Sequence, residues 1–298
     1  MAFLLFYHLL SFLYLFPYGL YHLISSTRSY LLPSSSPYKA LPFHPLPLPS
    51  SPLRSIPLHF SLVFLLLSCF VSPFLYPSIL LSLQFTLPLL LFTLLSISLL
   101  LFPPPSDLVF LLASLSFYFL SLAASNSSNT YPPTDLQSKS LSLSSVISLV
   151  SALSSLTLAI SPRIFLAELT LASSISLHGL WSLQSGLSLY ADAFIPNGCH
   201  ALLEKPGVTR CDLDESRARA VEIFDLAFVL HITVIAVIAV AVYGVVAKVQ
   251  GGSGGNGNAR RHNSVSYDVL PTTSGAAAMD ELEHHVPMKA MAKTTAQE

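Results

Sequence analysis

Five ionisable side chains that fall within long apolar stretches have the clearest potential for chemistry in this sequence. They are His22, Glu168, His178, Asp225 and His231. An ionisable group inside a membrane segment is costly to bury, so it commonly marks a proton or ion site. Two interpretations stay open. Either these residues form an intramembrane polar site, or the carboxylates are solvated near an interface, where the helix dipole favours them, and the histidines hydrogen-bond within a bundle.

The spacing of the first histidines allows a test for haem ligation. His8 and His22 are 14 residues apart, which is about 21 Å along a helix and roughly on one face. Two stacked haems would also need histidines at matching depths on a facing helix. His178 lies near the middle of its apolar stretch and His231 in the first half of the next, so two layers do not form. We therefore expect no haem, no other cofactor and no metal ion.

The cysteines supply one candidate disulfide. Cys69 lies in an apolar run, which leaves Cys199 and Cys211, on either side of a short polar turn in the loop 191–222. In an oxidising compartment a bond between them would stabilise the loop by about 3 kcal/mol. The alternative is two reduced cysteines that only pack. A zinc site that uses both cysteines and His200 lacks a recognised ligand spacing.

Catalytic patterns cannot be assembled from these residues. No Ser-His-Asp arrangement is indicated, and the glycines after Gln250 follow an apolar stretch and resemble a linker rather than a phosphate-binding loop. We therefore expect no catalytic residues and a protein that is not an enzyme.

Two short patterns concern trafficking. Asn126-Ser127-Ser128 is an N-glycosylation sequon in a predicted loop. The segment from Tyr267 to Leu270 has the form of a tyrosine-based sorting signal.

The elements that must position these residues follow from composition. The 298 residues are 52% hydrophobic and only 10% charged, against about 25% charged in soluble domains. The formal net charge of -1 gives no basic face for nucleic acid. A spanning helix needs about 20 predominantly apolar residues. We predict an all-α, multi-pass transmembrane bundle in residues 1–247 with about seven spans, at 3–24, 56–76, 79–102, 107–124, 141–160, 164–190 and 223–246.

Proline and the first apolar run leave alternatives for the number of spans. Pro77 and Ser78 alone separate the second and third spans, so a re-entrant hairpin would reduce the count to six. A cleaved signal peptide is the alternative for the first run, although no basic residue precedes it and it exceeds the usual apolar core. Residues 25–57 are predicted to be an extended connector, and residues 248–298 a disordered polar tail.

Orientation follows from Lys and Arg, which are enriched in short cytoplasmic loops. With seven spans, the side opposite the N-terminus holds slightly more of these residues. This distribution favours an N-terminus outside and a tail in the cytoplasm.

Several short motifs resemble the transmembrane protein 45 family, whose plant branch is a domain of unknown function. The motifs are Gly19-Leu20-Tyr21-His22 (Gly-Leu-Trp-His in the family), His178-Gly179-Leu180-Trp181, Ile195-Pro196-Asn197-Gly198-Cys199, Arg210-Cys211 and Ala218-Arg219-Ala220. The middle departs from the family, because residues 125–140 hold Ser and Asn where many plant members carry histidines. The resemblance implies a seven-helix protein of endomembranes or plasma membrane, with members linked to stress or pathogen responses and no established enzymatic activity.

Our functional expectation is a non-enzymatic membrane protein. It would act through interactions with the lipid bilayer and with membrane-protein partners or further copies of itself. The alternative is a transporter or channel that uses the intramembrane carboxylates and histidines. A seven-helix receptor is indicated by helix count alone, which is an analogy of fold and not of a site.

Overall fold

The structure, a computed structural model, describes residues 2–32, 37–47, 51–75, 78–132, 135–201 and 209–252. This part of the chain contains seven long helices, which are α1 (Ala2–Leu31), α3 (Ile56–Leu75), α4 (Ile79–Leu101), α5 (Ser106–Ser128), α6 (Leu136–Ile160), α7 (Phe165–Tyr190) and α8 (Asp214–Gly252). Shorter elements are α2 (Ser51–Arg54), the 3-10 turn η1 (Asp192–Phe194), and the strands β1 (Cys199–Ala201) and β2 (Thr209–Cys211). The disordered tail predicted for residues 248–298 is wrong at its start, because residues 248–252 continue α8. The rest of the predicted tail, including Tyr267 and Leu270, lies outside the described residues.

Six of the seven long helices are long and apolar enough to cross a membrane by length and composition. Large apolar side chains such as Phe70 and Val240 point outward and are more than two-thirds exposed. Outward apolar side chains match a hydrocarbon solvent, in which the helix satisfies its own backbone hydrogen bonds. The predicted class, an all-α multi-pass membrane bundle, is confirmed.

Among the long helices of the described residues, α7 is the one that is not apolar enough to be recognised as a membrane span from its composition. Its 26 residues are enough to cross a bilayer, but it carries Glu168 and many serines. Those polar residues are buried against neighbouring helices. Polar groups inside a bundle are tolerated because neighbouring helices, and not lipid, surround them. Hydropathy alone therefore does not identify α7, the sixth predicted span, as a membrane helix. The reason is that its polar residues face neighbouring helices and not lipid.

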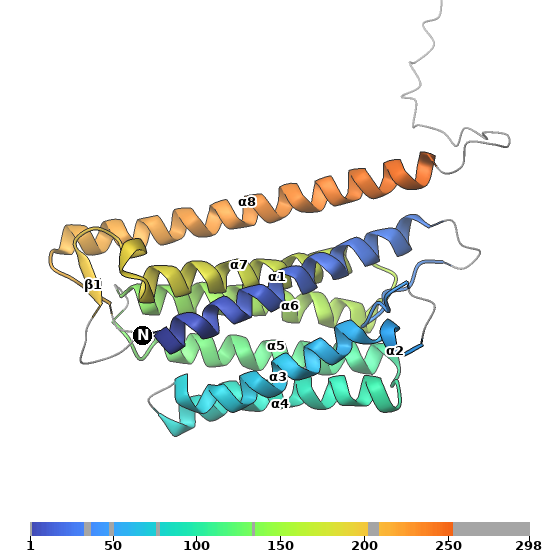
Figure 1. Ribbon diagram of the computed structural model, residues 1–298, viewed down its shortest axis with the longest axis horizontal. Coiled ribbons are helices and arrows are strands. Elements are labelled where there is room, and N and C mark those ends of the chain that lie inside the picture. The colour runs from blue at the N-terminus through green and yellow to red at the C-terminus, as the bar shows by residue number, and fades with distance from the viewer. Residues whose placement is uncertain are drawn as a thin grey trace, which may run out of the picture. The chain divides into compact units, whose positions relative to one another are not determined.

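The helices run side by side in Figure 1, where α1 lies against α7, and α5 lies against α6. Helices α3 and α4 extend the bundle from α5, while α8 lies along α1, α6 and α7. Helices α1 and α7 run antiparallel, because Gly19 lies beside Ser176 and Gly186 beside His8. The start of α7 therefore lies at the same end of the bundle as the end of α1.

Small residues allow close contact between the most intimately packed helices. At Gly179 an added Cβ atom would lie 2.6 Å from the Phe16 amide nitrogen. Serines form a ladder between α5 and α6, whose pairs of hydroxyl donor and carbonyl acceptor are Ser114 and Ala152 (2.8 Å), Ser121 and Ser145 (2.9 Å), and Ser128 and Ser138 (2.9 Å). Small and hydroxyl-bearing residues are typical of helix contacts in membranes.

A β-hairpin connects α7 to α8. Strands β1 and β2 pair antiparallel with Cys199 opposite Cys211, and a disulfide joins these two cysteines. Gly198 precedes the hairpin with φ of +84°, a left-handed conformation that favours glycine. The hairpin lies at the end of the bundle where α7 ends and α8 begins.

The connector after α1 differs from the extended segment that the sequence predicts. Residues 25–31 continue α1, and part of the remainder packs on the helix ends. Ala40 is fully buried and its amide donates to the Pro162 carbonyl at 2.7 Å. The cluster around Ala40 includes Phe110 and Leu158. Burial of this short stretch explains how a proline-rich connector becomes part of the core.

Candidate functional site

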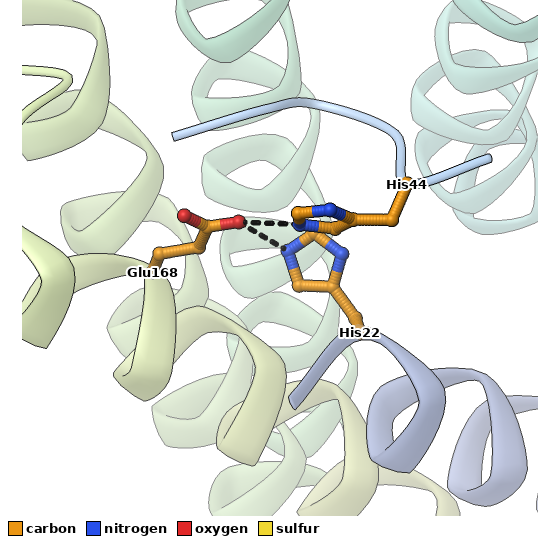
Figure 2. A group of neighbouring side chains, drawn as sticks. All are labelled: His22, His44 and Glu168. Atoms are coloured by element: carbon orange, nitrogen blue, oxygen red, sulfur yellow. Dashed lines mark hydrogen bonds and ion pairs between the residues drawn. The ribbon is translucent and has the colours of Figure 1, made fainter. Parts of the chain in front are cut away.

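Three buried side chains from three separate elements converge at one end of the bundle. His22 comes from the second half of α1, His44 from the connector segment 37–47, and Glu168 from the first turn of α7. Their exposed fractions are 6%, 5% and 0%. His44 Nε2 lies 2.8 Å and His22 Nε2 lies 3.4 Å from Glu168 Oε1. Figure 2 shows both imidazole rings directed at this one carboxylate oxygen.

We call these three residues the His-His-Glu cluster. Two tyrosines position it through hydrogen bonds. The Tyr38 hydroxyl donates to Glu168 Oε2, and the Tyr21 hydroxyl donates to the backbone carbonyl of His44 at 2.8 Å. Burial, and then the charge of Glu168, raise the pKa of Tyr38, so its phenol stays protonated and able to donate. Pro45 follows His44 and favours an extended backbone at that histidine. The cluster is thus positioned by both ends of a short ordered segment.

One nitrogen of the cluster is left without a hydrogen bond. Within the described residues, His22 Nε2 is buried and has no hydrogen-bond partner, although it lies 3.4 Å from Glu168 Oε1. A buried polar atom without a partner costs stability, about 1–3 kcal/mol. Two imidazole nitrogens and a carboxylate oxygen, all within 4.8 Å of one another, can share a proton or hold a metal ion.

A cavity of about 360 Å³ lies among α1, α3, α4, α5, α6 and α7. Leucine and phenylalanine side chains make up much of its wall, and serine, tyrosine and histidine side chains supply the polar groups. No Asp, Glu, Lys or Arg of the described chain lines it. His22 lies on this wall as well as in the His-His-Glu cluster, so the cluster borders the cavity.

Two further histidines face the same cavity. His8 Nδ1 lies 3.1 Å from the Ser182 hydroxyl, which fixes its ring. His178, one of the predicted site residues, also lines the cavity. Its imidazole is therefore available to a molecule inside the cavity.

Asp225 and His231, also predicted as site residues, lie elsewhere. Asp225 pairs with Lys139 at 2.7 Å, and the two side chains are 49% and 27% exposed. Lys139 precedes Ser140, which bonds to Ser185 near the end of α7, so this pair lies at the opposite end of the bundle from Glu168. The Nδ1 nitrogen of His231 donates to the Ala227 carbonyl oxygen within its own helix. The structure thus groups His22 and Glu168 and separates Asp225 and His231 from them.

Asn126 lies in the last turn of α5 and not in a loop as predicted. The helix continues to Ser128 because Ser127 and Ser128 are buried in the bundle, where Ser128 bonds to Ser138. The Asn126 side chain is exposed and donates to Gln84 Oε1 at 3.4 Å.

His44 is the member of the cluster that the sequence does not indicate. It stands between prolines in a segment predicted to be an extended connector, outside every apolar run. Its only sequence signal is a histidine within a proline-rich stretch, which is not specific for any site.

The bundle and its buried polar centre define the class of this molecule, a multi-pass helical membrane protein. Residues 106–244, from the start of α5 through most of α8, match the model of a family of unknown function (DUF716). The chain is similar to this family over these residues, and the family corresponds to the transmembrane protein 45 family indicated by the sequence motifs. No curated protein matches the chain. The matched region includes Glu168 and His178, while His22 and His44 lie before it.

Proposed function

We propose that this protein is a non-enzymatic binding protein of the endomembrane system or plasma membrane. It holds an uncharged, lipid-like molecule among its helices. The observation that carries this proposal is the cavity of about 360 Å³, since pockets of about 300–1,000 Å³ suit small-molecule ligands. Interaction with the bilayer, with membrane-protein partners or with a second copy, and a place in stress or pathogen responses, belong to the same proposal.

The lining of the cavity favours that class of ligand. An apolar wall with few polar groups binds a mainly apolar body and orients it through one or two hydrogen bonds. His178 lines the cavity and offers an imidazole to a hydroxyl or carbonyl group of the ligand. A strongly charged ligand would find no opposite charge on the described wall and would lose its solvation.

Retention of lipids through purification tests this proposal. Ala113 lines the cavity, so Ala113→Phe should fill part of it. The matched control is Ala236→Phe on the exposed side of α8. We expect native mass spectrometry of protein from mild detergent to show a bound uncharged lipid on the parent and on Ala236→Phe, and at least a tenfold lower occupancy on Ala113→Phe. Equal occupancy of all three proteins, or no bound lipid on the parent, would contradict the proposal.

A transporter or channel is the second candidate. It is favoured by the position of His22, which borders both the cavity and buried Glu168. Purified protein in vesicles should then show proton or cation flux that Glu168→Gln reduces and Asp225→Asn leaves unchanged, because Asp225 lies at the opposite end of the bundle. Flux that is equal in the parent and in Glu168→Gln would remove this candidate.

A further inference from the structure

The donor atoms of the His-His-Glu cluster are of the types that bind transition metals. Two imidazole nitrogens and one carboxylate oxygen form a common three-ligand set for zinc and related divalent ions. Calcium and magnesium instead require an oxygen-rich shell of about six ligands, which this cluster does not offer. The chemistry of the cluster therefore favours a transition-metal ion of intermediate hardness, such as zinc.

The distances require only a small adjustment for such an ion. Ligands of a tetrahedral zinc ion, at bond lengths of about 2.0–2.1 Å, stand about 3.3–3.4 Å apart. His22 Nε2 and Glu168 Oε1 are already 3.4 Å apart, while His44 Nε2 and Glu168 Oε1 are 2.8 Å apart. Separation of His44 from Glu168 by about half an ångström would bring this pair to the zinc spacing, and all three donor atoms already lie within 4.8 Å of one another.

Hydrogen bonds within the chain do not satisfy the cluster. The bond between His44 and Glu168 accounts for one imidazole nitrogen, but His22 Nε2 keeps no partner among the described residues. This nitrogen is more than nine-tenths buried and directed at Glu168. An ion between the three donors would satisfy both imidazoles and the carboxylate at once.

The surrounding groups support ligand roles for His44 and Glu168. Tyr38 occupies Glu168 Oε2, so Oε1 alone faces the histidines and is available as a single ligand atom. Tyr21 holds the backbone of His44. Outer hydrogen bonds of this kind orient the ligands of metal sites.

We propose that His22, His44 and Glu168 bind one divalent transition-metal ion of the zinc class. The ion joins the connector segment 37–47 to α1 and α7 and leaves a fourth coordination position for water or another ligand. This site does not depend on the lipid-like ligand proposed for the cavity.

Metal binding by the full chain in detergent or nanodiscs, without a histidine tag, tests the proposal. After treatment with a chelator, the protein is titrated with Co²⁺ and its ligand-field absorption is followed, and bound Zn²⁺ is measured by mass spectrometry. We expect about one ion per chain. His44→Ala and Glu168→Gln should each weaken binding at least 100-fold. The matched control is His59→Ala, because His59 is exposed and bonds to the Ser55 carbonyl of its own helix region instead of the cluster.

A second measurement guards against variants that fail to fold. Zn²⁺ should raise the thermal unfolding midpoint of the parent, of His59→Ala and of the cavity variant Ala113→Phe, but not that of His22→Gln. Retained binding by Ala113→Phe separates this proposal from that of the lipid ligand. A parent that binds neither ion, or binding that survives both His44→Ala and Glu168→Gln, would overturn the proposal and leave a hydrogen-bonded proton site.

Discussion

The hydrogen bond from Tyr38 to Glu168 links the connector to the centre of the bundle. Glu168 is fully buried, and a buried carboxylate is tolerated only when donors or charges compensate it. Tyr38 supplies the donor for Oε2, while His44 contacts Oε1. Loss of either contact should therefore lower the free energy of unfolding and change the geometry of the cluster.

We expect Tyr38→Phe to lower the free energy of unfolding by about 1–3 kcal/mol, because Oε2 of Glu168 would lose its donor. The measurement is SDS-induced unfolding in mixed micelles. The control is Tyr118→Phe, since Tyr118 is exposed and its change should stay within about 0.5 kcal/mol. Equal effects of the two substitutions would show that the Tyr38 hydroxyl contributes nothing.

The contribution of Tyr38 has a definite pH dependence. Its pKa is raised in the folded protein, first by burial and then by the charge of Glu168. The contribution is therefore fully present below the unfolded pKa of about 10 and is lost as pH rises above it. The difference between the parent and Tyr38→Phe should shrink under alkaline conditions and stay constant near neutral pH.

Only part of the candidate site could be predicted at the level of residues. His22 and Glu168 stand in apolar runs, where an ionisable group is conspicuous, and they do meet. His44 could not be found in this way, because its burial depends on how the connector packs on the ends of α1 and α7. Asp225 has the same sequence signal as Glu168, yet it pairs with Lys139 near a partly exposed helix end. Tertiary neighbours, and not local sequence, separate these two carboxylates.

Close contact between α1 and α7 depends on glycine. At Gly179 the backbone of Phe16 occupies the space that a Cβ atom would need, whereas nothing lies within 4 Å at Gly244 on α8. The two glycines therefore allow the same substitution to be compared at a packed and an open position of two long helices.

We expect Gly179→Ala to destabilise the protein by about 1–3 kcal/mol, because α1 and α7 must move apart. Gly244→Ala should be neutral or stabilising by up to about 1 kcal/mol, since alanine is the better helix former. The same mixed-micelle unfolding experiment measures both. If Gly179→Ala proved as stable as Gly244→Ala, the packing of α1 on α7 would be less close than the structure shows.

The existence of the long helices could be predicted well, because an apolar run of about 20 residues is typical of a membrane-spanning helix. Their contacts could not. The serine ladder between α5 and α6 uses serines seven residues apart on α5, at positions 114, 121 and 128. That spacing predicts one face of a helix, but it does not name the partner helix. The proline-rich connector shows the same limit. Its composition predicts an extended segment, but the burial of Ala40 makes part of it belong to the packed core.

The path of the chain through the whole bundle follows from α7. This helix runs antiparallel to α1, from the end that holds the His-His-Glu cluster to the end that holds the disulfide hairpin. If α7 crosses the bilayer with its neighbours, five crossings separate the connector from the hairpin. The two must then lie on opposite sides. If α7 does not cross, as hydropathy alone indicates, four crossings remain and both lie on the same side.

Cysteine labelling distinguishes these arrangements. Lys39 and Asp192 are both exposed, so Lys39→Cys and Asp192→Cys, each in a Cys69→Ala background that keeps the disulfide, can report the two ends. We expect a membrane-impermeant maleimide added to sealed vesicles to label one of the two positions, and the other only after the vesicles are opened. Labelling of both positions from the same side would remove α7 from the crossing helices. Glu168, which contacts His22, His44 and Tyr38, would then lie on a helix that does not cross the bilayer.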